Sequence, residues 1–71
     1  MGAAAPSSKD LDALRKWLHD VNNRVGVILA SAELLQMDPL PPQVATRCKA
    51  IEDQALEMRE ILHAISDHYF S

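Results

Sequence analysis

The sequence predicts an all-α protein: an antiparallel two-helix hairpin that dimerises into a four-helix bundle. The chain of 71 residues is 48% hydrophobic but only 4% aromatic, and it has two glycines, a composition that favours helices over a β-sandwich or barrel. Two long stretches repeat apolar residues at the alternating three-and-four spacing of a helical seam. Between them, the stretch over residues 38–42 holds three prolines and predicts the turn.

The first helix is expected to begin just after Ser7. Residues 1–7 are small and unpatterned and predict a disordered leader, while Ser7 followed by Asp10 has the spacing of a capping box. The helical hairpin domain is therefore expected over residues 8–71. The first seam consists of Leu11, Leu14, Leu18, Val21, Val25, Ile28, Ala32 and Leu35.

The second helix is expected after the prolines, with Pro41 or Pro42 in its first turn. Its seam consists of Val44, Cys48, Ile51, Ala55, Met58, Leu62, Ile65 and Tyr69. Each helix should have about 27 to 29 residues and be about 40 Å long, and a short connection predicts that the two fold back antiparallel.

One such hairpin leaves much of its apolar surface in water, because further apolar residues lie beside both seams. They are Ala13, Trp17, Val27 and Leu34 in the first helix and Leu56 and Ile61 in the second. Two hairpins packed together would cover them, so we expect a homodimer.

Charge and cysteine content exclude several classes of function. Seven Lys and Arg against ten Asp and Glu give a formal charge of −3, which argues against nucleic-acid binding and against a polybasic membrane surface. Cys48 is the single cysteine, so neither an internal disulfide nor a paired-cysteine metal site is expected, and a reducing, cytoplasmic setting fits best. No stretch approaches the roughly 18 apolar residues of a membrane span, so no membrane contact is expected.

His19 is the candidate for chemistry. On a helical wheel it lies about 130° from the centre of the first seam, so it should face outward, with Asn23 and Gly26 on the same strip. Gly26 would leave space beside that strip. An exposed imidazole next to a carboxylate, here Asp20, is suited to act as a nucleophile, with the carboxylate fixing the ring tautomer.

The sequence around His19 resembles the phosphoacceptor box of sensor histidine kinases. The match comprises LHDVNN over residues 18–23 and ILASAELL over residues 28–35, which is similar to the subgroup whose box reads His-Asp-x-Asn-Asn and continues Ile-Leu-x-x-Ala-Glu-Leu-Leu. The resemblance extends over most of the chain, from Leu11 to about Tyr69, since the dimerisation and phosphoacceptor domain of that family is a long helical hairpin. The chain departs from the usual pattern at Arg24 and at Ala30.

The resemblance implies a role for each matching residue. His19 would be the phosphoacceptor and Asp20 the acidic residue that activates it. Asn23 would position a water for dephosphorylation of the partner without taking part in activating the imidazole, and Asn22 is given only helix-surface hydrogen bonding. Arg24 would either lean toward the phosphate or pair with Asp20 one turn earlier.

The resemblance also implies partners. They are an ATP-binding kinase domain, a response-regulator receiver domain whose aspartate takes the phosphate, and a second copy of the chain. No cofactor is expected on this chain, with ATP and Mg²⁺ belonging to the kinase domain, and the chain alone should not phosphorylate itself. Two alternatives stay open: a stand-alone phosphotransfer protein, and a purely structural dimerisation hairpin with a vestigial box.

Other candidate residues give weaker hypotheses. His63 and Asp67 lie one helical turn apart, but two ligands do not make a metal site, so no metal is expected. Cys48 is interpreted as a small apolar core residue.

Overall fold

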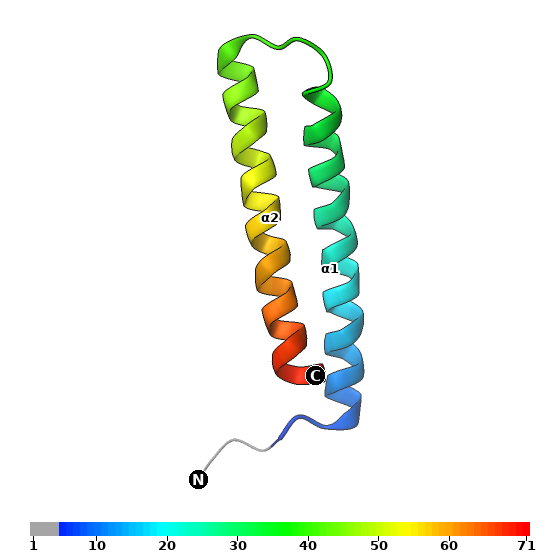
Figure 1. Cartoon of the computed structure of the whole chain (residues 1–71). Helices are drawn as coiled ribbons and strands as arrows, with labels where there is room; N and C mark the ends of the chain where they lie inside the picture. Colours follow the sequence, from blue (N-terminus) through cyan, green and yellow to red (C-terminus); the bar gives the residue numbers. More distant parts are fainter. Residues whose placement is uncertain (1–4) are drawn as a thin grey trace.

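Two helices make up the fold, as predicted. The computed structural model describes residues 5–71, in which α1 spans Ser8–Leu35 and α2 spans Pro42–Phe70. They run antiparallel, with the chain ends at one end of the hairpin and the connection at the other (Figure 1). The helices have 28 and 29 residues, within the predicted lengths. The all-α hairpin is thereby confirmed.

The start of each helix follows from its local sequence. Asp10 N donates to Ser7 Oγ at 3.0 Å and Ser7 N donates to Asp10 Oδ2 at 3.3 Å, which is the predicted capping box. Pro42 is the first residue of α2, where its missing N–H costs no helical hydrogen bond. Of the expected leader, residues 1–4 lie outside the described residues and residues 5–7 precede α1.

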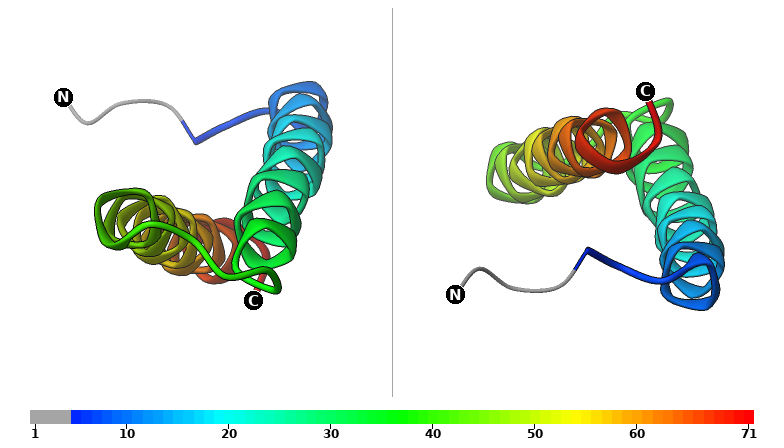
Figure 2. Two further views of the ribbon diagram at one scale, coloured as in Figure 1. Left: turned by 90° about the horizontal axis from the view of Figure 1, so that it is seen from above. Right: turned by 90° about the horizontal axis from the view of Figure 1, so that it is seen from below.

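The hydrophobic core is small and lies midway along the hairpin. Val25 and Leu29 of α1 pack with Ala55 of α2, and Leu62 covers them from the side. Ala32 and Cys48 are also buried, nearer the connection, so Cys48 is a small core residue as interpreted. Seen along their length, the two helices are inclined to one another (Figure 2).

Three of the eight residues of the first seam and four of the eight of the second are exposed. In the first seam, Val21, Ile28 and Leu35 are 39%, 44% and 54% exposed, whereas Leu29, outside the seam, is buried and Asn22 is half-buried. The reason is that the residues of the seam point in two directions, and only one of these directions is toward α2. The buried and half-buried residues of α1 include Leu18, Asn22, Val25, Leu29 and Ala32.

The exposed members of both seams, together with the neighbouring Trp17, lie along one side of the hairpin, which we call the apolar stripe. Apart from Leu35, each residue of the stripe directly precedes a buried or half-buried position, as Ile28 precedes Leu29 and Ile51 precedes Glu52. Because successive residues rotate by about 100° in one sense and the helices are antiparallel, these preceding positions lie on the same side of the hairpin. The apolar stripe comprises Trp17, Val21, Ile28, Leu35, Val44, Ile51, Met58 and Tyr69.

The opposite side of the hairpin carries the residues that directly follow inward positions. His19 follows Leu18, and His63 follows Leu62. We call this side the His19 face. Many of its side chains are polar, among them Asn23, Lys49 and Asp53, although Ala30 and Leu56 also lie there.

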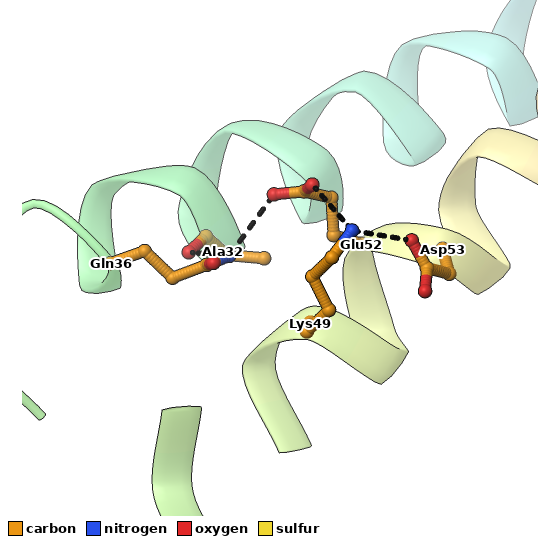
Figure 3. A network of polar contacts seen from close by, with 5 residues as sticks. All are labelled: Ala32, Gln36, Lys49, Glu52 and Asp53. Atoms are coloured by element: carbon orange, nitrogen blue, oxygen red, sulfur yellow. Dashed lines mark hydrogen bonds and ion pairs between the residues drawn. The ribbon is translucent and has the colours of Figure 1, made fainter. Parts of the chain in front are cut away.

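A polar network joins the two helices near the connection (Figure 3). Gln36, which caps the C-terminal end of α1, donates through Nε2 to Ala32 O at 3.1 Å and to Glu52 Oε2 at 3.0 Å. Lys49 Nζ lies 3.9 Å from Glu52 Oε1 and 3.1 Å from Asp53 Oδ1. The network therefore ties the end of α1 to the second and third turns of α2.

Over residues 5–71, neither helix combines the length and the apolar character needed to cross a membrane.

Candidate functional site

His19 lies on α1, exposed to solvent on the His19 face, as predicted. Asn23 follows one turn later, and its Nδ2 donates a hydrogen bond to His19 Nε2 at 3.3 Å. The amide NH₂ can donate to Nε2 only when the neutral ring carries its proton on Nδ1, so the contact is compatible with that tautomer. In that tautomer the lone pair of Nε2 is directed toward Asn23.

Asp20 makes no hydrogen bond to the ring in the described part of the chain, although it is the neighbouring residue. It is exposed, and the ring contact comes from Asn23 instead. Asn23 therefore contacts the ring, whereas its expected role as the residue that positions a water stays a prediction. The helix explains the contact: residues i and i+4 are stacked on one face, whereas i+1 is rotated by about 100°.

An open cavity of about 260 Å³ lies beside His19, between α1 and α2. The cavity forms where two kinds of residue from both helices meet: those that face the other helix, and those that directly follow them in sequence. The cavity is lined by Arg15, Leu18, His19, Asn22, Leu62, His63, Ser66 and Phe70. It thus brings His19 of α1 and His63 of α2, which are far apart in sequence, to one site.

Arg15 is a member of this site that the sequence reasoning missed. Its guanidinium carbon lies 4.5 Å above the centre of the Phe70 ring, and its Nη1 is 3.3 Å from Asp12 Oδ1. These contacts hold a positive charge at the edge of the cavity. Arg15 lies four residues before His19, so the sequence indicates that the two share a helix face. The contact of Arg15 with Phe70 could not be predicted, because it depends on how the helices pair.

Arg24, the predicted phosphate-proximal residue, does not line the cavity of His19. It borders a separate hollow of about 280 Å³ together with Asn23, Val27 and Ile28. Within residues 5–71 it also forms no ion pair with Asp20. The arginine that shares a cavity with His19 is Arg15.

Asn22 is less superficial than the sequence indicated. It is half-buried on the line of contact with α2, where helix-surface hydrogen bonding was expected. Its Oδ1 is buried and accepts no hydrogen bond from the described residues. A buried acceptor without a donor costs about 1–3 kcal/mol, so this oxygen is a feature that requires a physical explanation.

Gly26 occupies a half-buried position one turn beyond Asn22 and Asn23. A Cβ added there would meet only Arg59 Nη2, at 3.9 Å, which is ordinary van der Waals contact. The space next to the strip is therefore open toward α2.

Lys49 is the residue whose titration the surroundings clearly change. Its hydrogen bond to Asp53, followed by the charges of Asp53 and Glu52, raises the pKa of Lys49 above the ordinary value of 10.5. Lys49 and Asp53 follow the inward residues Cys48 and Glu52, so this pair also lies on the His19 face, nearer the connection.

Among residues 5–71 no three His, Cys, Asp or Glu side chains are grouped so as to hold a metal ion. His63 lines the cavity beside His19, and Asp67 is exposed one turn further along α2.

Comparison of the chain with models of protein families, with curated proteins and with solved structures finds no match.

Proposed function

We propose that the chain is the dimerisation and histidine phosphoacceptor domain of a two-component sensor kinase, with His19 as the acceptor. The observation that carries the proposal is the exposed imidazole whose Nε2 accepts a hydrogen bond from Asn23. This contact is compatible with the neutral tautomer that has a lone pair on Nε2, which is the form a nucleophile needs. The sequence runs around His19 support the same role by resemblance.

In this mechanism, His19 Nε2 attacks the terminal phosphorus of ATP held by a separate kinase domain. An N–P bond forms and the P–O bond to ADP breaks, while the Nδ1 proton is released to Asp20 or to water. The phosphoryl group then passes to an aspartate carboxylate of a receiver domain, which breaks the N–P bond. Such transfers depend mainly on positioning and charge stabilisation.

Asn23 has to yield its hydrogen bond when Nε2 attacks. The contact is long, at 3.3 Å, and exposed, so it orients the ring at little energetic cost to the reaction. Its amide is then released at the position where, by the resemblance, a water for receiver dephosphorylation would be held.

Dimerisation is part of the proposal, and the apolar stripe is the surface that a second copy would cover. The stripe and His19 lie on opposite sides of the hairpin. Packing two stripes together would therefore build a four-helix bundle and leave His19 open to a kinase domain and a receiver domain.

The apolar stripe favours one other function, a purely structural dimerisation hairpin. Its exposed side chains include Trp17 at 62% and Ile51 at 48%, and they account for dimerisation without any chemistry at His19. The two functions differ in whether His19 takes up phosphate.

The deciding experiment incubates the full chain with ATP, Mg²⁺ and the purified kinase domain of a His-Asp-x-Asn-Asn sensor kinase. We expect one acid-labile, alkali-stable phosphate per chain, located on His19 by mass spectrometry. His19→Gln should abolish it, while His63→Gln and His68→Gln should retain it. Helix content, measured by circular dichroism, should be unchanged in all three variants.

Phosphate on His63 or His68 in the unsubstituted chain would contradict the assignment of His19. No phosphate on any histidine, with several kinase domains of the subgroup, would favour the structural hairpin. Transfer from the phosphorylated chain to a receiver domain, in the absence of any kinase domain, tests the phosphotransfer step separately.

A further inference from the structure

We propose that the cavity beside His19 is a binding site for a phosphate oxyanion, either free phosphate or the phosphoryl group carried by His19. The proposal rests on the proposed function for the second of these sources only. Residues that the sequence reasoning left unassigned, namely Arg15, Asn22, His63 and Ser66, form the site together with His19.

The polar lining of the cavity suits an anion. Arg15 supplies a guanidinium, His63 an imidazole N–H and Ser66 a hydroxyl, and no aspartate or glutamate lines the cavity. Arg15 uses one N–H toward Asp12, and a guanidinium has five. Charged donors of this kind form the stronger hydrogen bonds to phosphate oxygens.

The cavity is also organised before any ligand arrives. The Phe70 ring lies under the Arg15 guanidinium, 4.5 Å from its central carbon, and Phe70 itself lines the cavity. Stacking on an aromatic face restricts the long arginine side chain, so less conformational entropy is lost on binding.

Asn22 determines which oxyanion fits. Its buried Oδ1 has no donor among the described residues, and Asn22 lines the cavity. Because Oδ1 is buried, the amide has to rotate toward the cavity for a ligand to reach it, and a ligand that then satisfies Oδ1 must bring a hydrogen-bond donor as well as the acceptor oxygens that Arg15 and Ser66 require. Hydrogen phosphate and a singly protonated phosphoryl group carry a P–OH, whereas sulfate at neutral pH has no O–H. The site should therefore prefer phosphate to sulfate.

The position of the site relates it to the chemistry at His19. The cavity is lined by His19 and is bounded by the inward residues Leu18 and Leu62, so a phosphoryl group on the ring has a receiving pocket on the same face. Arg15 of α1 would neutralise part of its charge, and His63 of α2 would donate an imidazole N–H to it.

The first experiment titrates the full chain with sodium phosphate and, separately, with sodium sulfate at constant ionic strength and pH 7, followed by ¹H–¹⁵N NMR. We expect saturable shifts at the Arg15 Nε–H, the His63 ring and the Ser66 amide, with tighter binding of phosphate. Arg15→Gln and His63→Gln should each weaken phosphate binding by about 3- to 10-fold, the scale of a partly exposed charge-assisted hydrogen bond. Arg24→Gln and His68→Gln are the matched controls and should leave binding unchanged.

Asn22→Ala tests the selectivity. It should reduce the preference for phosphate over sulfate to about one while both anions still bind, because the acceptor for the P–OH is lost and the donors remain. Circular dichroism confirms that helix content is retained. Equal affinities for phosphate and sulfate in the unsubstituted chain, or titrations insensitive to Arg15→Gln, would overturn the proposal.

The second experiment separates the two sources of phosphate. The chain is phosphorylated chemically with phosphoramidate, the product that carries phosphate on His19 alone is isolated and verified by mass spectrometry, and the phosphate titration is repeated. We expect the Arg15, His63 and Ser66 resonances to shift on phosphorylation and inorganic phosphate no longer to bind. Unchanged phosphate affinity after phosphorylation would overturn the assignment of this cavity to the phosphoryl group. The His19→Gln variant separates the two proposals. If it is no longer phosphorylated but still binds inorganic phosphate, the anion site is supported independently of the result with the kinase domain.

Discussion

At the scale of single residues, the His19 ring contacts the residue one helical turn away. Asn23 Nδ2 lies 3.3 Å from His19 Nε2, a contact that is compatible with the neutral tautomer protonated on Nδ1. Asp20, adjacent in sequence, is rotated away from the ring by the helix. The two residues can therefore be separated by substitution.

Asn23→Ala should change the tautomer of His19. Loss of the donor to Nε2 removes the reason for the proton to stay on Nδ1, so a mixture of the two neutral forms is expected. Long-range ¹H–¹⁵N NMR of the imidazole measures this directly, and Asn22→Ala on the same helix is the control. A ring that stays wholly in the Nδ1–H form would show that Asn23 does not determine the tautomer.

Asp20→Asn should slow phosphorylation of His19 without altering the fold. If Asp20 takes the Nδ1 proton as Nε2 attacks, its loss costs roughly 10- to 1,000-fold in rate, within the usual range for general acid–base groups. The measurement is the initial rate with a supplied kinase domain, with Glu33→Gln as an exposed α1 control. A rate equal to that of Glu33→Gln would assign proton removal to water.

At the scale of the elements, local sequence signals determine where each helix begins and ends. The capping box at Ser7 satisfies backbone donors that no preceding turn can satisfy, and the prolines before Val44 end one helix and begin the next. These devices are local, so they act whether or not the helices pack.

Ser7→Ala should destabilise the hairpin by about 0.5–2 kcal/mol, the usual cost of losing an N-cap side chain. The free energy of unfolding in urea, measured by circular dichroism, tests this. Ser8→Ala, at the first helical residue, is the control and should have a smaller effect. Equal losses in both variants would mean that the Ser7 hydroxyl does not cap α1 in solution.

Asp53→Asn should lower the pKa of Lys49 toward 10.5, because it removes the carboxylate charge of Asp53 and replaces a charged hydrogen-bond acceptor with a weaker, neutral one. A raised lysine pKa stabilises the folded chain below the unfolded pKa, and this contribution is lost as the pH rises through the folded value. The stabilisation should thus be present up to about the ordinary value of 10.5 and fade above it. NMR titration of Lys49 Nζ is the measurement, with Asp67→Asn as control, and an unchanged titration would contradict the ion pair.

At the scale of the whole molecule, the hairpin has two unlike faces. The core between the helices is narrow, and among residues 5–71 Val25 is the one large side chain that is almost fully buried. The apolar stripe lies on one side and His19 on the other. Association through the stripe would complete the core without obstructing the site.

Val25→Asp and Ile28→Asp should therefore have different effects. Val25 is 1% exposed within one hairpin, so a charge there should unfold the chain, whereas Ile28 is 44% exposed and its variant should dissociate a dimer while keeping helix. Sedimentation equilibrium and circular dichroism distinguish the outcomes, and Ala30→Asp on the His19 face is the control. A chain that is monomeric before any substitution would contradict dimerisation through the stripe.

The sequence by itself determined where the two helices of this protein begin and end. The tertiary structure decided which residues of one helix meet which residues of the other. The capping box at Ser7, the break at residues 38–42 and the outward position of His19 depend on spacing within one helix, so they could be predicted. Which residues of each seam face the partner helix could not be predicted, because the same apolar repeat can pack against either of two neighbouring helices. The cavity could not be predicted either. Arg15, His63 and Phe70 meet only when two helices pair in one register, and that register is set by packing between residues distant in sequence.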